Sequence, residues 1–258
     1  MRWIETHLEG HIAQLILKRK DAANALNQEM LDEIMETFHG WQNDLNVRAI
    51  VITGDGEKVF SAGADLKERK TMNESEVKKA VAKIGEMVNT VERMPIPVIA
   101  AINGAAIGGG LELALACDLR IASENSKFAL TETGLGIIPG AGGTQRLPRT
   151  IGVQRAKEMI FTGKKIEASL AYDWGLILSV VPSRSLMVEA MGLAEAISKN
   201  APIAIRQAKK AINNGMEVDL NTGLTIEKKA YEMTIPTKDR KEGLQAFKEK
   251  RNPVFKGE

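Results

Sequence analysis

Two acidic residues stand in stretches that are otherwise apolar or rich in glycine. Glu112 lies in GAAIGGGLELALACD, residues 104–118, and is the only charged residue between Arg93 and Asp118. A buried, unpaired carboxylate either destabilises the fold or has its pKa raised. A raised pKa is typical of a catalytic acid or base. The alternative for Glu112 is a position on the solvent-exposed face of a helix.

The second acid, Glu132, is near the start of TETGLGIIPGAGGTQRL, residues 131–147. Loops so rich in glycine inside a compact domain usually bind or catalyse. A helix-capping or surface acid is the alternative interpretation. Two carboxylates in such settings can divide the work of general acid and general base.

Backbone amides close to these acids could stabilise negative charge. The three glycines at 108–110 precede the helix predicted for Glu112, where free N–H groups point at an approaching anion, unless they only form a tight turn. The segment FSAGADLK, residues 60–67, offers further accessible backbone at Ala64. Asp65 could instead cap a helix beginning at Leu66. Neither G-x-G-x-x-G nor a Walker A loop occurs in the chain, so a dinucleotide fingerprint and a P-loop are excluded.

The elements that must position these residues alternate between strand and helix. Hydrophobic periodicity predicts helices at 28–43, 74–93 and about 109–116. Short apolar runs predict strands at 49–53, 98–102 and 119–122, after a strand pair within 3–17. The alternation predicts an α/β fold with parallel pairing. From about residue 183 the pattern predicts a purely helical C-terminal appendage.

Composition limits the function classes. A net charge of +2 and 4% aromatic residues argue against a nucleic-acid partner. The single cysteine, Cys117, excludes a disulfide within the chain, and no apolar run is long enough for a membrane helix. A cytoplasmic enzyme is therefore the default expectation, with a mature organelle protein that has lost its transit peptide as the alternative, and Cys117 is expected to be a core residue. No spacing of the three histidines predicts a metal site.

The motifs together resemble one family. The three segments above and IPTKDRKEGLQAFKEKR, residues 235–251, are similar to the crotonase (enoyl-CoA hydratase/isomerase) superfamily over nearly the whole chain. The strings ADLKER, LALACD, NNGMEVDL and IPTKDR resemble its methylglutaconyl-CoA hydratase branch. The resemblance implies the α/β crotonase (ClpP-like) spiral of ββα repeats as a core over residues 1–195. It further implies a helical trimerisation region over 196–258, and a homo-trimer or hexamer.

The resemblance also assigns roles. It implies reversible syn addition of water to a 2-enoyl-CoA, giving a 3-hydroxyacyl-CoA, in fatty-acid or branched-chain amino-acid breakdown. By family analogy Glu112 handles the water and Glu132 the Cα proton, with the amides of Ala64 and Gly109 as the oxyanion hole. No metal or separate cofactor is implied, since coenzyme A is part of the substrate. The expected acyl-CoA contacts, some of them from a neighbouring subunit, are Lys18, Ala23, Ala25, Ala62, Asp65, Leu66, Lys67, Gly108, Pro139, Gly140, Phe247 and Lys250.

Other activities stay open at this point. The substrate could be 3-methylglutaconyl-CoA from leucine degradation, and its carboxylate should need a cation that the sequence does not identify. An enoyl-CoA isomerase is disfavoured because isomerases of the family typically lack one of the two glutamates. RNA binding in this branch uses a Lys-rich helix, whereas residues 28–46 contain no Lys or Arg. Neither a nucleic acid nor a membrane is therefore expected as a partner.

Overall fold

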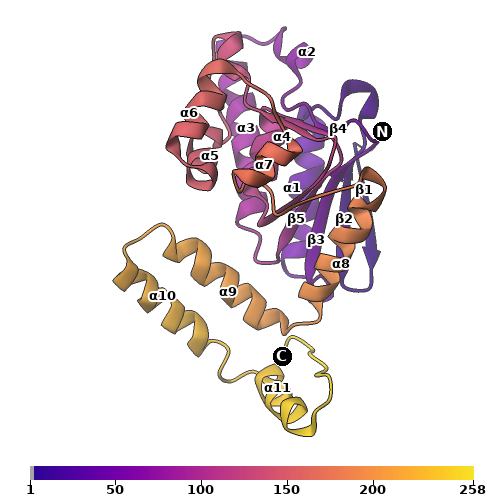
Figure 1. Ribbon diagram of the computed structural model, residues 1–258, viewed down its shortest axis with the longest axis vertical. Coiled ribbons are helices and arrows are strands. Elements are labelled where there is room, and N and C mark those ends of the chain that lie inside the picture. The colour runs from indigo at the N-terminus through magenta and orange to yellow at the C-terminus, as the bar shows by residue number, and fades with distance from the viewer. Residues whose placement is uncertain (1–2) are drawn as a thin grey trace.

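The computed structural model describes residues 3–258. Its strands and helices build one α/β body from which the C-terminal helices project (Figure 1). The strands are β1 (Ile4–Glu9), β2 (Ile12–Leu17), β3 (Ala49–Gly54), β4 (Val59–Ser61), β5 (Val98–Ile102), β6 (Ala105–Ile107), β7 (Leu119–Ser123), β8 (Lys127–Ala129), β9 (Ile166–Glu167) and β10 (Ser179–Val181). The α-helices are α1 (Gln28–Gln42), α2 (Leu66–Arg69), α3 (Glu74–Glu92), α4 (Gly109–Ala116), α5 (Gly143–Ile151), α6 (Val153–Thr162), α7 (Ala168–Asp173), α8 (Leu186–Ser198), α9 (Pro202–Gly215), α10 (Leu220–Glu232) and α11 (Lys238–Glu249).

The larger sheet has the strand order β1-β2-β3-β5-β7-β10. Only β1 and β2 pair antiparallel in it, around Gly10, and the remaining neighbours are parallel. Every residue of β3 and β5 is buried because both faces of the sheet are covered. Ile50 and Ile52 join the core that includes α1 and α3, and Ala49 and Val51 face α8.

The smaller sheet has the order β4-β6-β8-β9 and was not predicted. Strands β3, β5 and β7 belong to the large sheet. The strand that directly follows each of them in the chain belongs to the small sheet; these are β4, β6 and β8. Helical segments follow each pair, so successive β-β-α units wind as a spiral. The predicted α/β class, the parallel pairing and the ββα spiral are therefore confirmed.

The C-terminal region is helical, as predicted. Leu186, Ala190 and Ala194 of α8 are buried against the large sheet, and the predicted domain boundary at residue 195 falls inside this helix. Beyond it, α9 and α10 lie side by side and α11 follows, away from the sheets (Figure 1). One ion pair, from Lys209 Nζ to Asp118 Oδ2 at 2.6 Å, ties α9 to the body. No helix within residues 3–258 is both long enough and apolar enough to span a membrane.

Candidate active site

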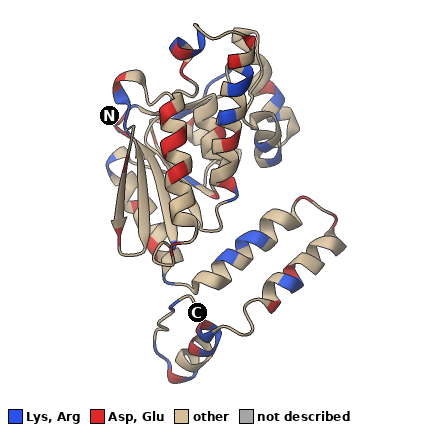
Figure 2. Ribbon diagram, turned by 180° about the vertical axis from the view of Figure 1, so that it is seen from behind, with Lys and Arg blue, Asp and Glu red and all other residues tan. Residues whose placement is uncertain are grey.

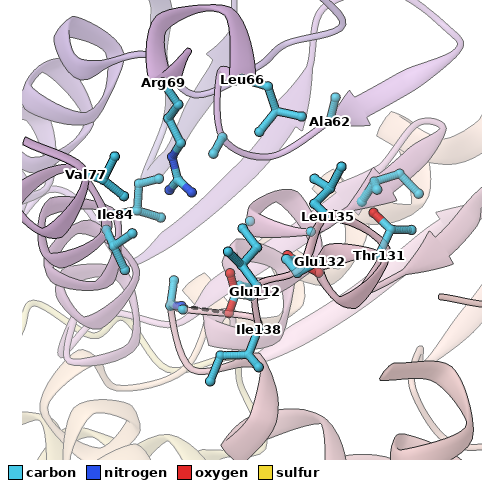
Figure 3. A pocket seen from close by; sticks show the side chains of 18 residues that line it. Ala62, Leu66, Arg69, Val77, Ile84, Glu112, Thr131, Glu132, Leu135 and Ile138 are labelled. Carbon is cyan, nitrogen blue, oxygen red and sulfur yellow. Dashed lines mark hydrogen bonds between the residues drawn. The ribbon is translucent and has the colours of Figure 1, made fainter. Parts of the chain in front are cut away.

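Both acids singled out from the sequence line the same cavity, which has a volume of about 610 Å³. Its walls come from α2, α3, the start of α4 and the segment 131–141, which includes the 3-10 helix η2 (Glu132–Leu135) (Figure 3). The lining is largely apolar, with contributions from Leu66, Val77, Val81, Ile84, Ile107, Leu135, Ile137 and Ile138.

Glu112 lies in the first turn of α4, a helix whose residues are all buried. Its own exposed fraction is 3%. The side-chain atom Oε1 accepts hydrogen bonds from the amides of Ala141 and Gly143, both at 2.8 Å (Figure 3 draws a hydrogen bond at this carboxylate). Burial raises the pKa of Glu112, and the two amides partly oppose that rise. The surface alternative for Glu112 is therefore excluded.

Glu132 opens η2 and is half-buried. Its atom Oε2 is buried and has no hydrogen-bond partner within residues 3–258. Burial raises the pKa of Glu132, and repulsion from Glu112 raises it further. Gly108 leaves room for this carboxylate, because a β-carbon there would lie 2.8 Å from Glu132 Oε1.

The amides predicted to bind an oxyanion lie next to each other. A β-carbon on Gly109 would lie 3.5 Å from the Ala64 nitrogen, so the segment 63–64 crosses closely over the N-terminus of α4. Gly63 makes this crossing feasible with a φ of 84°, since a β-carbon there would lie 2.6 Å from the Gly109 nitrogen. Within residues 3–258 neither the Ala64 nor the Gly109 amide donates to another protein group. Both donors are therefore available to a ligand in the cavity.

A neighbouring segment, residues 23–26, fixes the backbone that carries Ala64. Ala62 donates to Ala23 at 3.0 Å, Leu26 to Gly63 at 2.8 Å, and Asp65 to Leu26 at 3.2 Å, all backbone to backbone. The Asp65 carboxylate accepts from the first amides of α2, so the capping alternative is confirmed for this residue. Asp65 also pairs with Arg19 Nη1 at 2.6 Å.

The residues expected to contact coenzyme A are dispersed. Four of them line the cavity: Ala62, Leu66, Gly108 and Gly140. Ala23, Ala25 and Asp65 belong to the supporting backbone just described, and Pro139 is buried.

The remaining expected contacts lie outside the cavity. Lys18 pairs with Glu5 at 2.7 Å on the surface, and Lys67 is exposed on α2. Phe247 is 86% exposed on α11, and Lys250 caps the same helix. In the single chain α11 lies at the opposite end of the molecule from α2 (Figure 1). Contact by these two residues across a subunit boundary stays a prediction.

Sequence reasoning missed several groups of the cavity. The amides of Ala141 and Gly143 escaped notice because a backbone donor has no side-chain signature. Arg69 had a signal: it follows Leu66 by three residues, a spacing that places both on one helix face.

Cys117, expected from the sequence to be a core residue, lies in the hydrophobic core. Cys117 is buried, and burial raises the pKa of its thiol to about 12, so it is a protonated core residue. Across residues 3–258, no cluster of three or more His, Cys, Asp or Glu side chains is placed to hold a metal ion.

Comparison with known proteins agrees with this geometry. A family model described as enoyl-CoA hydratase/isomerase matches residues 7–258. A crystal structure of enoyl-CoA hydratase from Bacillus anthracis superposes with a TM-score of 0.98 and 54% identity, covering 100% of both chains. Human mitochondrial methylglutaconyl-CoA hydratase is 47% identical over 262 residues, which cover 100% of this chain and 77% of that protein. The enoyl-CoA isomerase/hydratase fer4 of Mycosarcoma maydis is 45% identical over 255 residues, 95% of this chain and 93% of that protein. The chain therefore belongs to the enoyl-CoA hydratase/isomerase family, the crotonase superfamily of enzymes.

Proposed function

We propose that the protein is an enoyl-CoA hydratase, which adds water reversibly to a 2-enoyl-CoA and gives a 3-hydroxyacyl-CoA. One observation carries the proposal: two carboxylates with raised pKa values share a largely apolar cavity with two backbone amides that have no acceptor within residues 3–258. We infer an acyl-CoA thioester as the substrate because the chain belongs to the enoyl-CoA hydratase/isomerase family. The chemistry needs no separate cofactor.

In this mechanism the amides of Ala64 and Gly109 hold the thioester oxygen. Polarising that carbonyl makes Cβ electrophilic, and attack by water moves the π electrons toward the oxygen as an enolate. Each donor in such a pair is worth about 2.7–4 kcal/mol of barrier. The N-terminus of α4 adds its dipole to the same charge.

The surroundings of the two carboxylates support the division of labour expected by analogy. Glu112 accepts two amide hydrogen bonds, which favour its ionised form, so it serves as the base that takes a proton from water. Glu132 has one oxygen without a partner and is repelled by Glu112, so the pair holds its single proton there. The water oxygen bonds to Cβ, and the Glu132 proton passes to Cα. The two groups titrate as a pair, and proton exchange after product release restores them.

The test is the kinetics of Glu112→Gln and Glu132→Gln on crotonyl-CoA, followed by the loss of enoyl-thioester absorbance. We expect turnover to fall by roughly 10²- to 10⁴-fold, because each variant removes one acid–base group, while acyl-CoA binding is retained. Glu124→Gln, at an exposed site, is the control. Turnover near the wild-type value in either active-site variant would refute the proposal.

The preferred acyl chain is a finer question, and 3-methylglutaconyl-CoA is the second candidate. The human relative that is 47% identical to this chain is a methylglutaconyl-CoA hydratase, which favours this substrate. Comparing kcat/KM for crotonyl-CoA, longer 2-enoyl-CoAs and 3-methylglutaconyl-CoA decides between fatty-acid and leucine breakdown. An isomerase would instead consume a 3-enoyl-CoA without taking up water. The presence of both glutamates favours hydration.

Assembly and location are proposed on separate grounds. Large apolar side chains are exposed along the C-terminal helices, which supports a trimer or hexamer built through them; these include Val188, Ile212, Met216, Leu220, Leu224, Leu244 and Phe247. Helix α1 contains acidic residues and no Lys or Arg (ribbon colours in Figure 2), which supports the absence of a nucleic-acid partner. The lone buried thiol fits a reducing compartment such as the cytoplasm.

A further inference from the structure

We propose that Arg69 binds a carboxylate at the far end of the acyl group, and that the preferred substrates are 2-enoyl-CoAs whose acyl chain ends in a carboxylate. This inference rests on the proposed hydratase function and names the substrate class of the same site. It starts from a charge that the hydration mechanism does not use. Among the described residues that line the cavity, Arg69 is the one cation.

Among residues 3–258 the guanidinium of Arg69 has no hydrogen-bond or ion-pair partner. Arg19, Arg146 and Arg251 each pair with a carboxylate. Within residues 3–258 Arg69 forms no ion pair and its side chain donates no hydrogen bond. Figure 3 shows the side chain reaching from α2 into the cavity, toward the space in front of Glu112.

A role as counter-charge to the two glutamates does not explain this arrangement. The positive charge of Arg69 is near enough to lower the pKa of Glu112 and Glu132, but burial outweighs it and both pKa values stay raised. No contact within salt-bridge distance joins Arg69 to either carboxylate. Its hydrogen-bonding fork therefore stays open to another anion.

The surroundings of Arg69 indicate where that anion belongs. Val77 and Ile84 of α3 lie near it, on the side away from Glu132 (Figure 3), and Val81 of the same helix also lines the cavity. Apolar walls suit the methylene and methyl groups of an acyl chain, and they strengthen an ion pair by excluding water. A planar guanidinium matches a carboxylate with two parallel hydrogen bonds.

The phosphates of coenzyme A are the other source of negative charge. They would need several cations on an open surface, and the described lining offers Arg69 alone. Arg69 also shares its cavity with both glutamates and with the amides of Ala64 and Gly109, which surround the reacting end of the substrate. The geometry therefore favours the acyl carboxylate over the nucleotide.

The experiment compares two substrates that share coenzyme A and differ in one group. One is 3-methylglutaconyl-CoA, and the other is 3,5-dimethylhex-2-enoyl-CoA, in which an isopropyl group replaces the carboxylate. The readout is the ratio of the two kcat/KM values, measured for the wild type, Arg69→Met, Arg69→Lys and Lys70→Met. Lys70 is the control because it is the next residue, is exposed and does not line the cavity.

We expect the wild type to prefer the carboxylate substrate, and Arg69→Met to lower that ratio about 30-fold or more, the lower range for truncating one member of a charge pair. Arg69→Lys should restore part of the preference, since it keeps the charge and loses the fork. Lys70→Met should leave the ratio unchanged.

Three outcomes would overturn the inference. A wild type that prefers the neutral substrate contradicts it, while leaving the hydratase function in place. An equal loss on both substrates in Arg69→Met assigns the residue to the shared coenzyme A phosphates. Unchanged kcat/KM values on both substrates in Arg69→Met show that Arg69 does not bind the acyl group. If the wild type hydrates neither compound nor crotonyl-CoA, the proposed function fails instead.

Discussion

Arg146 should control catalysis from outside the cavity, by fixing the loop that holds Glu112. Its guanidinium binds both oxygens of Glu92, at 2.7 and 2.6 Å, and donates to the Ala141 carbonyl at 2.8 Å. The amides of Ala141 and Gly143 in turn donate to Glu112. Replacing Arg146 with Met removes the contacts with Glu92 and with the Ala141 carbonyl, and so loosens the loop whose amides bind Glu112.

The expected loss follows from the two amide bonds to Glu112. A hydrogen bond to a charged group contributes about 1.5–3 kcal/mol, so misplacing one of them lowers kcat by roughly 10- to 100-fold. The effect should fall on kcat more than on KM, because Arg146 does not line the cavity. The side chain of Glu92 is 41% exposed, so the lost ion pair itself should cost at most about 1–2 kcal/mol of folding free energy.

The pH profile gives a readout that a purely structural role would not change. Burial raises the pKa of Glu112, while the amides of Gly143 and Ala141 and the charge of Arg146 hold it down. Removing Arg146 should raise this pKa further. A base with a higher pKa becomes protonated at a higher pH, so the acidic limb of the kcat profile should move upward. Arg146→Lys keeps the charge and should show a smaller shift.

Arg149→Met is the matched control, since Arg149 lies on the same helix and its side chain is 60% exposed. Steady-state kinetics from pH 5 to 9, with urea unfolding of each variant, provides the measurements. If Arg146→Met keeps turnover within twofold of wild type and its acidic limb does not move, the argument that Arg146 positions Glu112 is wrong.

Three further predictions concern individual contacts. Gly108→Ala should lower kcat at least about 10-fold, because the new β-carbon would lie 2.8 Å from Glu132 Oε1. It should also destabilise the fold by about 1–3 kcal/mol, because φ is 53° at this position. Steady-state kinetics checks the first effect and urea unfolding the second. Glu112→Gln should be more stable than wild type at neutral pH, where the wild type pays for a buried charge. That advantage should shrink as the pH falls through the raised folded-state pKa toward 4.5, as unfolding at several pH values would show. Lys209→Met should cost about 2 kcal/mol, because Asp118 loses the cation 2.6 Å away; an unfolding midpoint equal to wild type would contradict this.

The long elements could be predicted because their hydrophobic periods are strong. The helix predicted at about 109–116 coincides with α4, and the one predicted at 74–93 ends a single residue beyond α3. The small sheet escaped because β4, β6 and β8 have three residues each, too few to show an alternating pattern. The segment 143–147, interpreted as loop, begins α5, where Pro148 in the helix interior speaks against a helix. Tertiary packing overrides that local preference.

The candidate site could be predicted only in part, because some of its signals are local in the sequence and others depend on the fold. Glu112 and Glu132 stood out because a charge in an apolar segment is unusual, and this property is local. Their meeting in one cavity depends on the spiral, which places β6 and β8 side by side so that the segments leaving these strands converge. The cation expected for an acidic acyl group was hidden in the ADLKER string, because an arginine on a short exposed helix resembles any surface charge.

Groups with unmet interactions concentrate around this cavity, and that concentration is itself an argument for function. A carboxylate oxygen of Glu132, the amides of Ala64 and Gly109, and the Arg69 guanidinium all lack protein partners within residues 3–258. Each would favour folding more if it were satisfied, because buried polar groups in proteins are usually hydrogen-bonded. Among the buried side-chain nitrogen and oxygen atoms of residues 3–258, the other one without a partner is Nε of Arg48, whose remaining two nitrogens donate to the carbonyls of Ser198 and Phe255. The two amide donors, the acid and the cation that line one cavity complement a ligand with an oxyanion, a carbon that accepts a proton and a carboxylate.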